Sequence, residues 1–203
     1  MMATTATATT TLGQSSLVLT SISGGGKDTM IEMLIDKRPD KFVKAINHTT
    51  RPKRSNEIDG VSYHFIAPEE FDRKLKNGDF IEHVTVHNNY YGLSFQSLKD
   101  VFEQNKIPLL TLDVHGVEQF QIQKLSATFV WLSCPSREEQ IRRLQNRGDS
   151  QESIDARIQT SVYEEGYYAK NTNKFDYNIL NDTDKQDDAF LKLWNIIIEK
   201  FDM

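Results

Sequence analysis

The chain has 203 residues, a formal net charge of −5 and a single cysteine, Cys134. A chain of this length can bury one substantial core. The acidic net charge excludes a global positive field that would attract nucleic acid or an anionic membrane. A single cysteine excludes an intrachain disulfide. We therefore expect a protein of a reducing compartment, the cytoplasm, without a nucleic-acid or membrane partner.

The N-terminal stretch, residues 1–15, is rich in alanine and threonine and lacks basic residues. A secretory signal has a basic start and a long apolar centre, so this stretch is expected to be a flexible N-terminal extension. No apolar run in the chain approaches the roughly 20 residues that a transmembrane helix needs.

A glycine-rich turn, Ser23–Lys27, follows the apolar run 17–19 and precedes a helical pattern at 29–36. Consecutive glycines let several backbone N–H groups point at one anion, and a helix that starts there adds its positive end. The stretch is a variant of the phosphate-binding loop G-x-x-x-x-G-K-[ST], with Ser21 in place of the first glycine and Asp28 in place of the magnesium-binding hydroxyl. Taken alone, it could also be a purely structural connector.

After a strand expected at 42–46, the loop at 47–54 contains three basic residues between 51 and 54. Planar guanidinium groups pair with phosphate through two bonds at once. This loop is therefore either an anion clamp or a solvated charged turn.

The following segment is interpreted as an inserted lobe, because it contains strands and only one short helix. Its expected elements are a strand at 61–66, a helix from Pro68 to about 77–78, a strand at 80–86 and an asparagine turn at 88–89.

Strands and helices then alternate to the end of the chain. We expect helices at 95–105, 117–124, 136–147, 151–168 and 187–201, and strands at 108–113, 128–133 and 177–181. The last helix carries an apolar stripe that is expected to contact the core. The stripe consists of Phe190, Leu193, Trp194, Ile197 and Ile198.

Alternating strands and helices predict a parallel sheet with helices on both faces. Ligands of such sheets bind beyond the carboxyl ends of the strands. Three candidate sites follow strands: the glycine loop, Arg51 with Arg54, and Asp113. The topology is expected to bring all three together.

The chain resembles the guanylate kinase family from about Leu17 to Phe201, on a series of motifs in the family's order and spacing. The matching segments are His48-Thr49-Thr50-Arg51-Pro52-Lys53-Arg54, Glu57-x-Asp59-Gly60-x-x-Tyr63-x-Phe65, Phe80-Ile81-Glu82, Asn89-Tyr90-Tyr91-Gly92, Leu112-Asp113-Val114-x-Gly116, Arg143-x-x-x-Arg147-Gly148, Arg157 and Asn181-Asp182. So many ordered matches are far more specific than any one of them.

The resemblance implies an α/β, P-loop NTPase-like three-layer fold with a parallel central sheet, an inserted mixed α+β nucleotide-binding lobe and a helical lid. It also divides the chain. The core P-loop domain would comprise 16–47, 95–140 and 170–203, the GMP-binding lobe 48–94, and the lid 141–169.

The family transfers the γ-phosphate of ATP to GMP, giving GDP and ADP, with Mg²⁺ bound to the ATP. By resemblance, the catalytic residues are Lys27, Arg51, Arg143, Arg147 and Arg157. The ATP-binding residues are Ser23, Gly24, Gly25, Gly26, Lys27, Asp28, Thr29 and Asn181. The GMP-binding residues are Asn47, Arg51, Arg54, Tyr63, Glu82, Tyr91 and Asp113. No side chain is expected to hold the metal directly, although Asp28 could reach it through water, and a monomer or homodimer is expected.

The chemistry of guanine supports the role of Glu82. Guanine presents two donors, its N1–H and its exocyclic amine, that suit one ionised carboxylate, whereas N1 of adenine is an acceptor. A site built around such bonds rejects the analogue that lacks them by about 10⁴-fold.

Five positions depart from the family pattern: Ser21, Asp28, Asn47, Leu93 and Thr111. Asp28 places a negative charge beside polyphosphate. Leu93 cannot hydrogen-bond the base through its side chain, so neighbouring Ser94 would have to compensate. Two alternatives to an active guanylate kinase stay open: a catalytically impaired guanylate-kinase-like nucleotide- or protein-binding module, and a kinase for a different base. The presence of Lys27 and three lid arginines favours the active enzyme.

Overall fold

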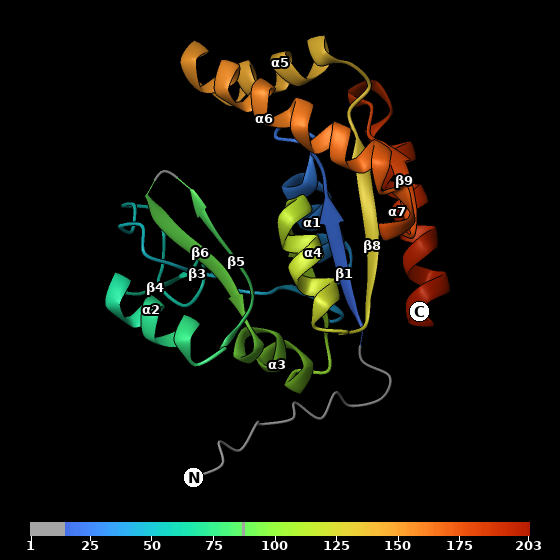
Figure 1. Ribbon diagram of the computed structural model, residues 1–203. Helices are drawn as coiled ribbons and strands as arrows, with labels where there is room; N and C mark the ends of the chain where they lie inside the picture. The colour runs from blue at the N-terminus through green and yellow to red at the C-terminus, as the bar shows by residue number, and fades with distance from the viewer. Residues whose placement is uncertain (1–14, 87) are drawn as a thin grey trace.

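A computed structural model describes residues 15–86 and 88–203, so the expected N-terminal extension lies outside the described residues except for its last position. The centre is a five-stranded parallel sheet in the order β2-β7-β1-β8-β9 (Figure 1). The strands are β1 (Ser16–Thr20), β2 (Phe42–Lys44), β7 (Ile107–Thr111), β8 (Ala127–Ser133) and β9 (Tyr177–Leu180).

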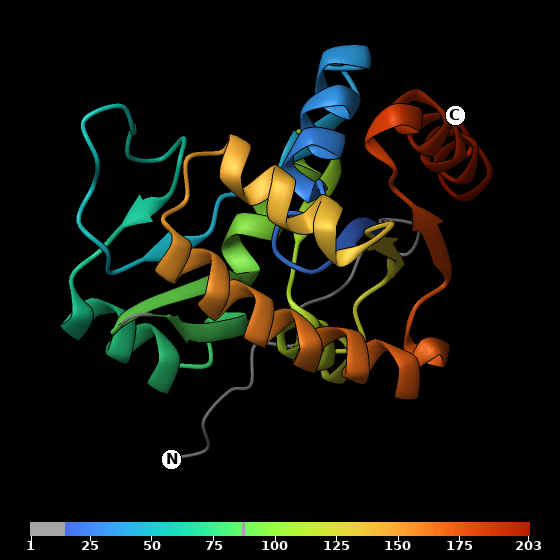
Figure 2. The ribbon, with the colours of Figure 1, turned by 90° about the horizontal axis from the view of Figure 1, so that it is seen from above.

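Helices cover both faces of this sheet. α1 (Lys27–Lys37) and α7 (Gln186–Phe201) pack on one face, and α3 (Phe95–Glu103) and α4 (Val114–Ile122) pack on the other (Figures 1 and 2). Because the side chains of a strand alternate between faces, Leu17 and Leu19 of β1 join the first pair of helices and Val18 joins the second. The predicted three-layer α/β fold is confirmed.

A second sheet of four strands is built from residues between 48 and 94, in the order β4-β3-β6-β5. Its strands are β3 (His48–Thr49), β4 (His64–Phe65), β5 (Phe80–Val86) and β6 (Asn89–Ser94). The sheet is mixed, because β3 pairs in parallel with β4 and antiparallel with β6. Helix α2 (Pro68–Lys76) covers it through Phe71, whose buried ring stacks on Phe80 and Tyr90 at centroid distances of 4.3 and 5.1 Å.

Two consecutive helices, α5 (Arg137–Asn146) and α6 (Gln151–Lys170), cross the upper end of the main sheet in Figure 1. Each begins at a serine, Ser136 or Ser150, whose hydroxyl accepts a backbone N–H three residues on. Short 3₁₀ helices at Thr172–Lys174 and Thr183–Lys185 flank β9. Within the described ranges, no helix combines the length and the apolar character that a bilayer-spanning segment requires.

Several elements differ from the prediction. The strand expected at 61–66 is reduced to β4, because the N–H groups of Val61 and Ser62 turn back to the carbonyl oxygen of Ile58. Helix α4 starts three residues earlier than expected, because the Asp113 carboxylate accepts the Gly116 N–H at 2.7 Å and caps the helix. The segment predicted as a basic loop contains strand β3.

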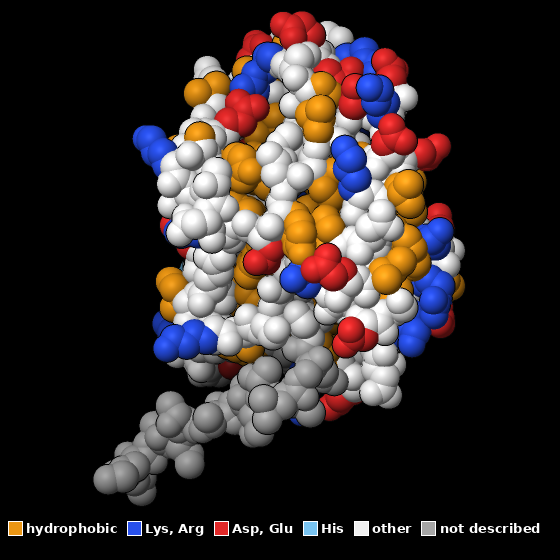
Figure 3. Space-filling model, turned by 90° about the vertical axis from the view of Figure 1, so that its right-hand side faces the viewer, with side chains coloured by type: hydrophobic (Ala, Val, Ile, Leu, Met, Phe, Trp, Pro, Cys, Tyr) orange, Lys and Arg blue, Asp and Glu red, His pale blue; other side chains and the backbone are white. Residues whose placement is uncertain are grey.

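The apolar stripe of α7 contacts the core through most of its members. Leu193 and Ile197 are fully buried, and Phe190 and Trp194 pack against the same cluster. The prediction is wrong for Ile198, which is 40% exposed because it lies on the outer side of the helix. Figure 3 shows this side of the molecule, where apolar side chains are scattered among charged ones.

Candidate active site

The turn between β1 and α1 has the backbone geometry of an anion cradle. Gly24 and Gly26 have φ angles of 81° and 93°, in the left-handed region that glycine enters without strain. The turn leads directly into α1, whose first N–H groups have no partner within the helix. Ser21 is not among the residues with positive φ, so serine fits at this position without backbone strain.

Gly25 is needed for a different reason, because it lies against Ser21. A Cβ atom on Gly25 would stand 1.6 Å from Ser21 Oγ and 2.7 Å from Ser21 Cβ. Ser21 is itself buried. The loop therefore depends on Gly25 for space and on Gly24 and Gly26 for backbone conformation.

Replacing Gly25 by alanine should lower the melting temperature by about 3–10 °C, since overpacking costs about 1–3 kcal/mol in a domain of this size. The double variant Ser21→Gly/Gly25→Ala removes the clashing atoms and should recover most of the loss. Melting curves from circular dichroism, with Ser21→Gly alone as the control, measure both effects. If Gly25→Ala melts at the wild-type temperature, residues 21 and 25 are not in contact.

Lys27 opens α1, and its side chain curls back over the loop. Its Nζ donates to the carbonyl oxygens of Ser21 at 2.6 Å and of Ile22 at 3.4 Å. Burial lowers the pKa of Lys27, and nearby carboxylates, chiefly that of Glu164, oppose this shift. An ammonium group held by two neutral carbonyls forms stronger hydrogen bonds with an anion, so Lys27 is suited to bind phosphate.

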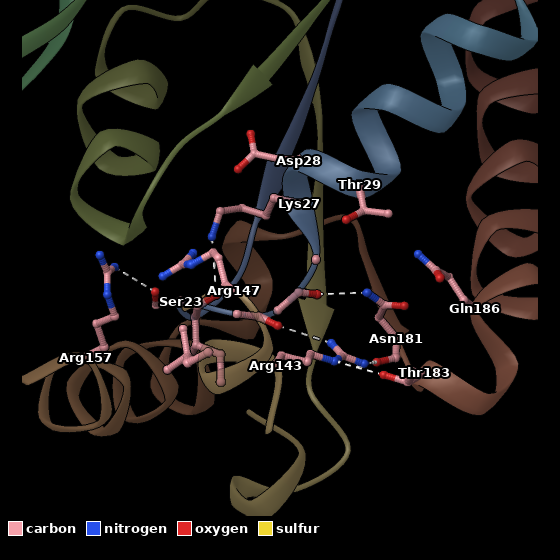
Figure 4. A pocket seen from close by; sticks show the side chains of 15 residues that line it. Ser23, Lys27, Asp28, Thr29, Arg143, Arg147, Arg157, Asn181, Thr183 and Gln186 are labelled. Carbon is pink, nitrogen blue, oxygen red and sulfur yellow. Dashed lines mark hydrogen bonds between the residues drawn. The ribbon is translucent and has the colours of Figure 1, made fainter. Parts of the chain in front are cut away.

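A cavity of about 560 Å³ opens over the loop and Lys27 (Figure 4). It is lined by residues 22–29, Arg143, Leu144, Arg147, Arg157, Asn181, Thr183 and Gln186. All the residues predicted for the ATP side and the three arginines predicted for the lid thus surround one cavity. Among the described residues that line it, only Asp28 is acidic.

Arg143 and Asn181 tie distant elements to the glycine loop. Arg143 donates to the carbonyl oxygens of Gly24 at 3.2 Å and of Asn181 at 2.7 Å, and to the Glu139 carboxylate at 2.7 Å. The Asn181 side chain donates to the Gly25 carbonyl oxygen at 2.9 Å. These bonds hold α5 and the end of β9 against a loop more than a hundred residues earlier in the chain.

The other two arginines approach the loop from the α5–α6 connection and from α6. Arg157 donates to the Ser23 hydroxyl at 3.0 Å and to the Ser153 hydroxyl at 3.2 Å. Arg147 donates to Asp149. Both side chains border the same side of the loop as Lys27 (Figure 4).

A second group of predicted residues lies where β5 contacts α4. Glu82 is 5% exposed, and its Oε1 accepts the Leu93 N–H at 3.0 Å. The register of β5 and β6 shifts between Phe80 and Glu82, and such a bulge redirects a side chain. Burial, with Asp113 close by, raises the pKa of Glu82 to about 7, against the effect of the Leu93 hydrogen bond.

Gly116 explains how Glu82 and Asp113 come close together. A Cβ atom on Gly116 would lie 3.3 Å from Glu82 Oε2 and 3.5 Å from Asp113 Oδ1. Both acids therefore border the first turn of α4. Two neighbouring carboxyl groups suit a ligand that presents adjacent hydrogen-bond donors.

Arg51 is held by an acid that was not among the predicted site residues. Its guanidinium group forms two bonds with Glu57, at 2.6 and 3.0 Å, and these bonds lower the pKa of Glu57 to about 2. Arg51 also lies over the rings of Tyr63 and Phe65, 5.6 and 5.7 Å from their centroids. The Tyr63 ring is 6.0 Å from that of Tyr91, so Arg51 and both tyrosines form one cluster.

The remaining predicted residues of this group are Arg54, which is exposed, and Asn47, whose backbone carbonyl accepts the His64 N–H at 2.9 Å. None of the second group lines the 560 Å³ cavity. The expectation that Arg51 and Arg54 follow a strand of the main sheet is wrong, because they follow β3 of the mixed sheet.

A family model described as guanylate kinase matches residues 13–200. The chain belongs to the guanylate kinase family. The guanylate kinase of Pseudomonas fluorescens is 37% identical over 166 residues, which cover 81% of this chain and 78% of that protein. The guanylate kinase of Clostridium perfringens is 33% identical over 183 residues, covering 90% and 82%. A crystal structure of guanylate kinase from Anaplasma phagocytophilum gives a TM-score of 0.65 at 26% identity, covering 92% of this chain and 86% of that one.

Two departures from the guanylate kinase pattern have a structural explanation. Ser94 does not compensate for Leu93, because its Oγ accepts the Ser97 N–H at 3.0 Å and caps α3. Leu93 instead buries its side chain in the core and uses its backbone N–H to hold Glu82. Asp28 is paired with Lys44, whose Nζ lies 2.9 Å from Asp28 Oδ1.

Two residues near this guanylate kinase site were not predicted. Glu164 on α6 is 9% exposed, and burial raises its pKa to about 7 although Lys27 opposes the shift. It lies two helical turns after Arg157, so helical periodicity could have indicated it. Lys44 belongs to no motif. The available indication of its place near the site was its position at the carboxyl end of β2.

Proposed function

We propose that the chain is an active guanylate kinase, which transfers the γ-phosphate of ATP to GMP and gives GDP and ADP. The observation that carries this proposal is the cavity where the glycine loop, Lys27 and three arginines converge. Phosphoryl transfer demands aligned reactants and positive charge around the phosphate oxygens, with little covalent chemistry from the protein.

ATP would occupy this cavity with its phosphates on the glycine loop. The backbone N–H groups of Gly24–Thr29 would bind phosphate oxygens at the positive end of α1. Lys27 would neutralise the outer phosphates. Ser23 begins the loop and lines the same cavity, and Asn181 would line the adenine side.

GMP would bind between the mixed sheet and α4. Glu82 and Asp113 would accept the guanine N1–H and exocyclic amine, and their closeness around Gly116 supports this. Asn47 would add a polar contact to the base. The GMP phosphate would be held by Arg51, Arg54, Tyr63 and Tyr91.

In this arrangement a phosphate oxygen of GMP attacks the γ-phosphorus of ATP, and ADP leaves as the bond to the β-phosphate oxygen breaks. The site must exclude water, which would otherwise accept the phosphoryl group. We assign this closure to residues 141–169 as the lid. Residues 48–94 would be the GMP-binding lobe, and residues 16–47, 95–140 and 170–203 the core.

Arg143 and Arg157 of the proposed lid make hydrogen bonds with neutral oxygens that a bound phosphate would replace. Besides its carboxylate partner Glu139, Arg143 donates to two carbonyl oxygens. Besides its carboxylate partner Asp149, Arg157 donates to two hydroxyl groups. A phosphate group adds an opposite charge and can accept two parallel hydrogen bonds from one guanidinium group. Nucleotide binding would therefore shift the bonds that both guanidinium groups make with neutral protein oxygens to phosphate oxygens.

The oxygen donors at the loop fit a magnesium ion that arrives with ATP. In nucleotide sites Mg²⁺ is held by one or two carboxylates together with phosphates and waters, and Asp28 lines the cavity. Among the described residues, no three His, Cys, Asp or Glu side chains gather as a metal site. Asp28 would hold the ion through water, and the ion would help to neutralise the transferred phosphate.

We also propose that the enzyme works in the cytoplasm, as a monomer or homodimer, without a nucleic-acid or membrane partner. The net charge of −5 supports the absence of such polyanionic partners. Cys134 is half-buried, and burial raises the pKa of its thiol, which fits a residue without a disulfide role in a reducing compartment.

A coupled assay for ADP tests the function. With ATP and Mg²⁺, the purified protein should release ADP only when GMP is added. AMP, UMP and CMP at equal concentration should react at least about a thousandfold more slowly, because none of their bases presents the two adjacent donors of guanine to the carboxylates. Well-folded protein that gives no ADP with GMP would overturn the proposal, and faster reaction with another monophosphate would identify a different base.

A further inference from the structure

Asp28, at the position where phosphate-binding loops carry a hydroxyl, is paired with a lysine from another element. The Lys44 ammonium lies 2.9 Å from Asp28 Oδ1. Asp28 belongs to the first turn of α1 and Lys44 is the last residue of β2, so both lie at the carboxyl edge of the main sheet. The two positions are 16 residues apart and share no motif.

Asp28 creates an electrostatic problem for nucleotide binding. It follows Lys27 directly and lines the cavity proposed for the ATP phosphates. A carboxylate there offsets the charge of Lys27 and repels a polyphosphate. Burial disfavours its ionised form, yet Lys44, with smaller effects of Lys27 and Arg147, lowers the pKa of Asp28. The carboxylate is therefore charged at neutral pH.

Lys44 is the cation that offsets this charge. The other cations near Asp28 have different partners, since Lys27 donates to loop carbonyls and Arg147 to Asp149. Because the charges of Asp28 and Lys44 cancel, the positive charge of Lys27 remains at the start of α1. The net charge there is the same as it would be with a neutral hydroxyl side chain at position 28. Figure 4 shows the Asp28 side chain on the side of Lys27 away from Asn181.

The pair also influences the second anion site electrostatically. Burial raises the pKa of Tyr63, the Lys44 ammonium is the largest charge that opposes the rise, and the Asp28 carboxylate adds to the rise with a smaller effect. Asp28 and Lys44 therefore influence both the donor cavity, which Asp28 lines, and the cluster for the acceptor phosphate. An uncancelled negative charge there would oppose both phosphates.

We propose that Lys44 is a positioning residue for the donor nucleotide: by neutralising Asp28, it lets the loop accept phosphates without a hydroxyl at position 28. This inference rests on the proposed function, because it takes the ATP phosphates to lie on the loop. Lys44 acts through Asp28 and not by contact with the reacting atoms.

A purely structural ion pair would behave differently. The side chains of Lys44 and Asp28 are 50% and 70% exposed, and pairs this exposed contribute little to stability. Breaking the pair should therefore leave the melting temperature nearly unchanged. Its effect should appear when a polyanion approaches Asp28, and it should depend on whether a divalent cation screens that carboxylate.

Calorimetric titration of ATP in EDTA should give an affinity about tenfold weaker for Lys44→Gln than for wild type, because glutamine keeps a hydrogen-bond donor but loses the charge. Lys44→Arg should bind ATP like wild type. The double variant Asp28→Ser/Lys44→Gln should regain wild-type affinity, because no uncompensated carboxylate remains. Mg²⁺ should shrink the defect of Lys44→Gln, because the ion screens Asp28 from the phosphates.

Lys99→Gln is the matched control. It breaks an exposed ion pair with Glu103 on α3, at 3.5 Å, away from the cavity lining, and should not change ATP affinity. Wild-type affinity in Lys44→Gln would overturn the inference. A double variant as weak as Lys44→Gln would also overturn it, because Lys44 would then act without Asp28. A stability loss that the double variant does not repair would assign Lys44 a structural role instead.

Failure of the proposed function gives a different result. Wild-type protein would then fail to bind ATP, or would bind it without phosphorylating GMP. If wild type binds ATP and Lys44→Gln binds it equally well, only the inference about Lys44 fails.

Discussion

Lys27→Ala is expected to lower the turnover of GMP phosphorylation at least about a hundredfold at saturating ATP and GMP. Loss of a fixed cation at the transferred phosphate removes roughly 3 kcal/mol of transition-state stabilisation. The structure adds a second reason. Lys27 Nζ also donates to the carbonyl oxygens of Ser21 and Ile22, so alanine removes the group that would fix both the loop and the phosphates. The coupled assay measures kcat directly.

The matched control for this prediction is Lys192→Ala. Lys192 is exposed on α7 and does not line the cavity, so its removal should leave kcat unchanged. Lys27→Ala should keep the wild-type circular dichroism spectrum, because the two carbonyl oxygens that Lys27 Nζ bonds lie in the loop, outside the helices and strands. Turnover near the wild-type value in Lys27→Ala would show that the ATP phosphates do not sit on the glycine loop.

The longer strands of both sheets could be predicted because their signals are local. The buried strand at 128–133 and the strand at 80–86 are apolar or alternating runs bounded by turn residues, and the structure has them as β8 and β5. The two-residue strand β3 could not be predicted, whereas β4 lies inside the longer strand expected at 61–66. β3 forms because it pairs with β6, some forty residues later, with Thr49 bonded to the Tyr90 carbonyl oxygen. No local pattern contains that pairing.

The site residues divide in the same way, into those with a local sequence signal and those whose contacts depend on the tertiary structure. The glycine loop is contiguous in sequence, and Arg143 and Arg147 are one helical turn apart, so their types and spacing were informative. The partners of these cations were not predictable, because they depend on tertiary distances. Glu57 binds Arg51, for example, and this pairing becomes visible only once the loop is folded.

Local rules also compete with one another, and the structure shows which one prevails. Ser94 is the last residue of β6 and directly precedes α3, and there its hydroxyl caps α3 in preference to facing a ligand. Asp113 likewise caps α4 while bordering Glu82. One side chain can thus satisfy a helix end and still present an oxygen to a site, which a sequence pattern does not distinguish.

Glu82→Gln is expected to weaken GMP binding at least about a hundredfold and to leave ATP binding unchanged. The glutamine amide would place a donor against the donors of guanine, and each buried group left unpaired costs about 1–3 kcal/mol. Glu82 does not line the cavity proposed for ATP, so the donor nucleotide should not sense the change. Calorimetric titrations with each nucleotide measure the two affinities.

The same substitution should raise the melting temperature at pH 8. The pKa of Glu82 in the folded protein, about 7, lies above the ordinary value of 4.5, so folding favours the protonated form. A carboxyl group of this kind destabilises the fold fully above its folded pKa, and the penalty fades as the pH falls toward 4.5. Glutamine carries no such penalty. The stability gain should therefore be largest above pH 7 and disappear near pH 4.5.

Wild-type affinity for GMP should fall about tenfold between pH 8 and pH 6, because the ionised fraction of a group with a pKa of about 7 drops from roughly nine-tenths to roughly one-tenth. A phosphate monoester also titrates near pH 6. Glu82→Gln is the matched control, since it keeps the phosphate titration and lacks the carboxyl group, so the ratio of the two affinities isolates Glu82. A parallel pH dependence in both proteins, or equal losses of ATP and GMP binding, would show that Glu82 supports the fold and does not read the base.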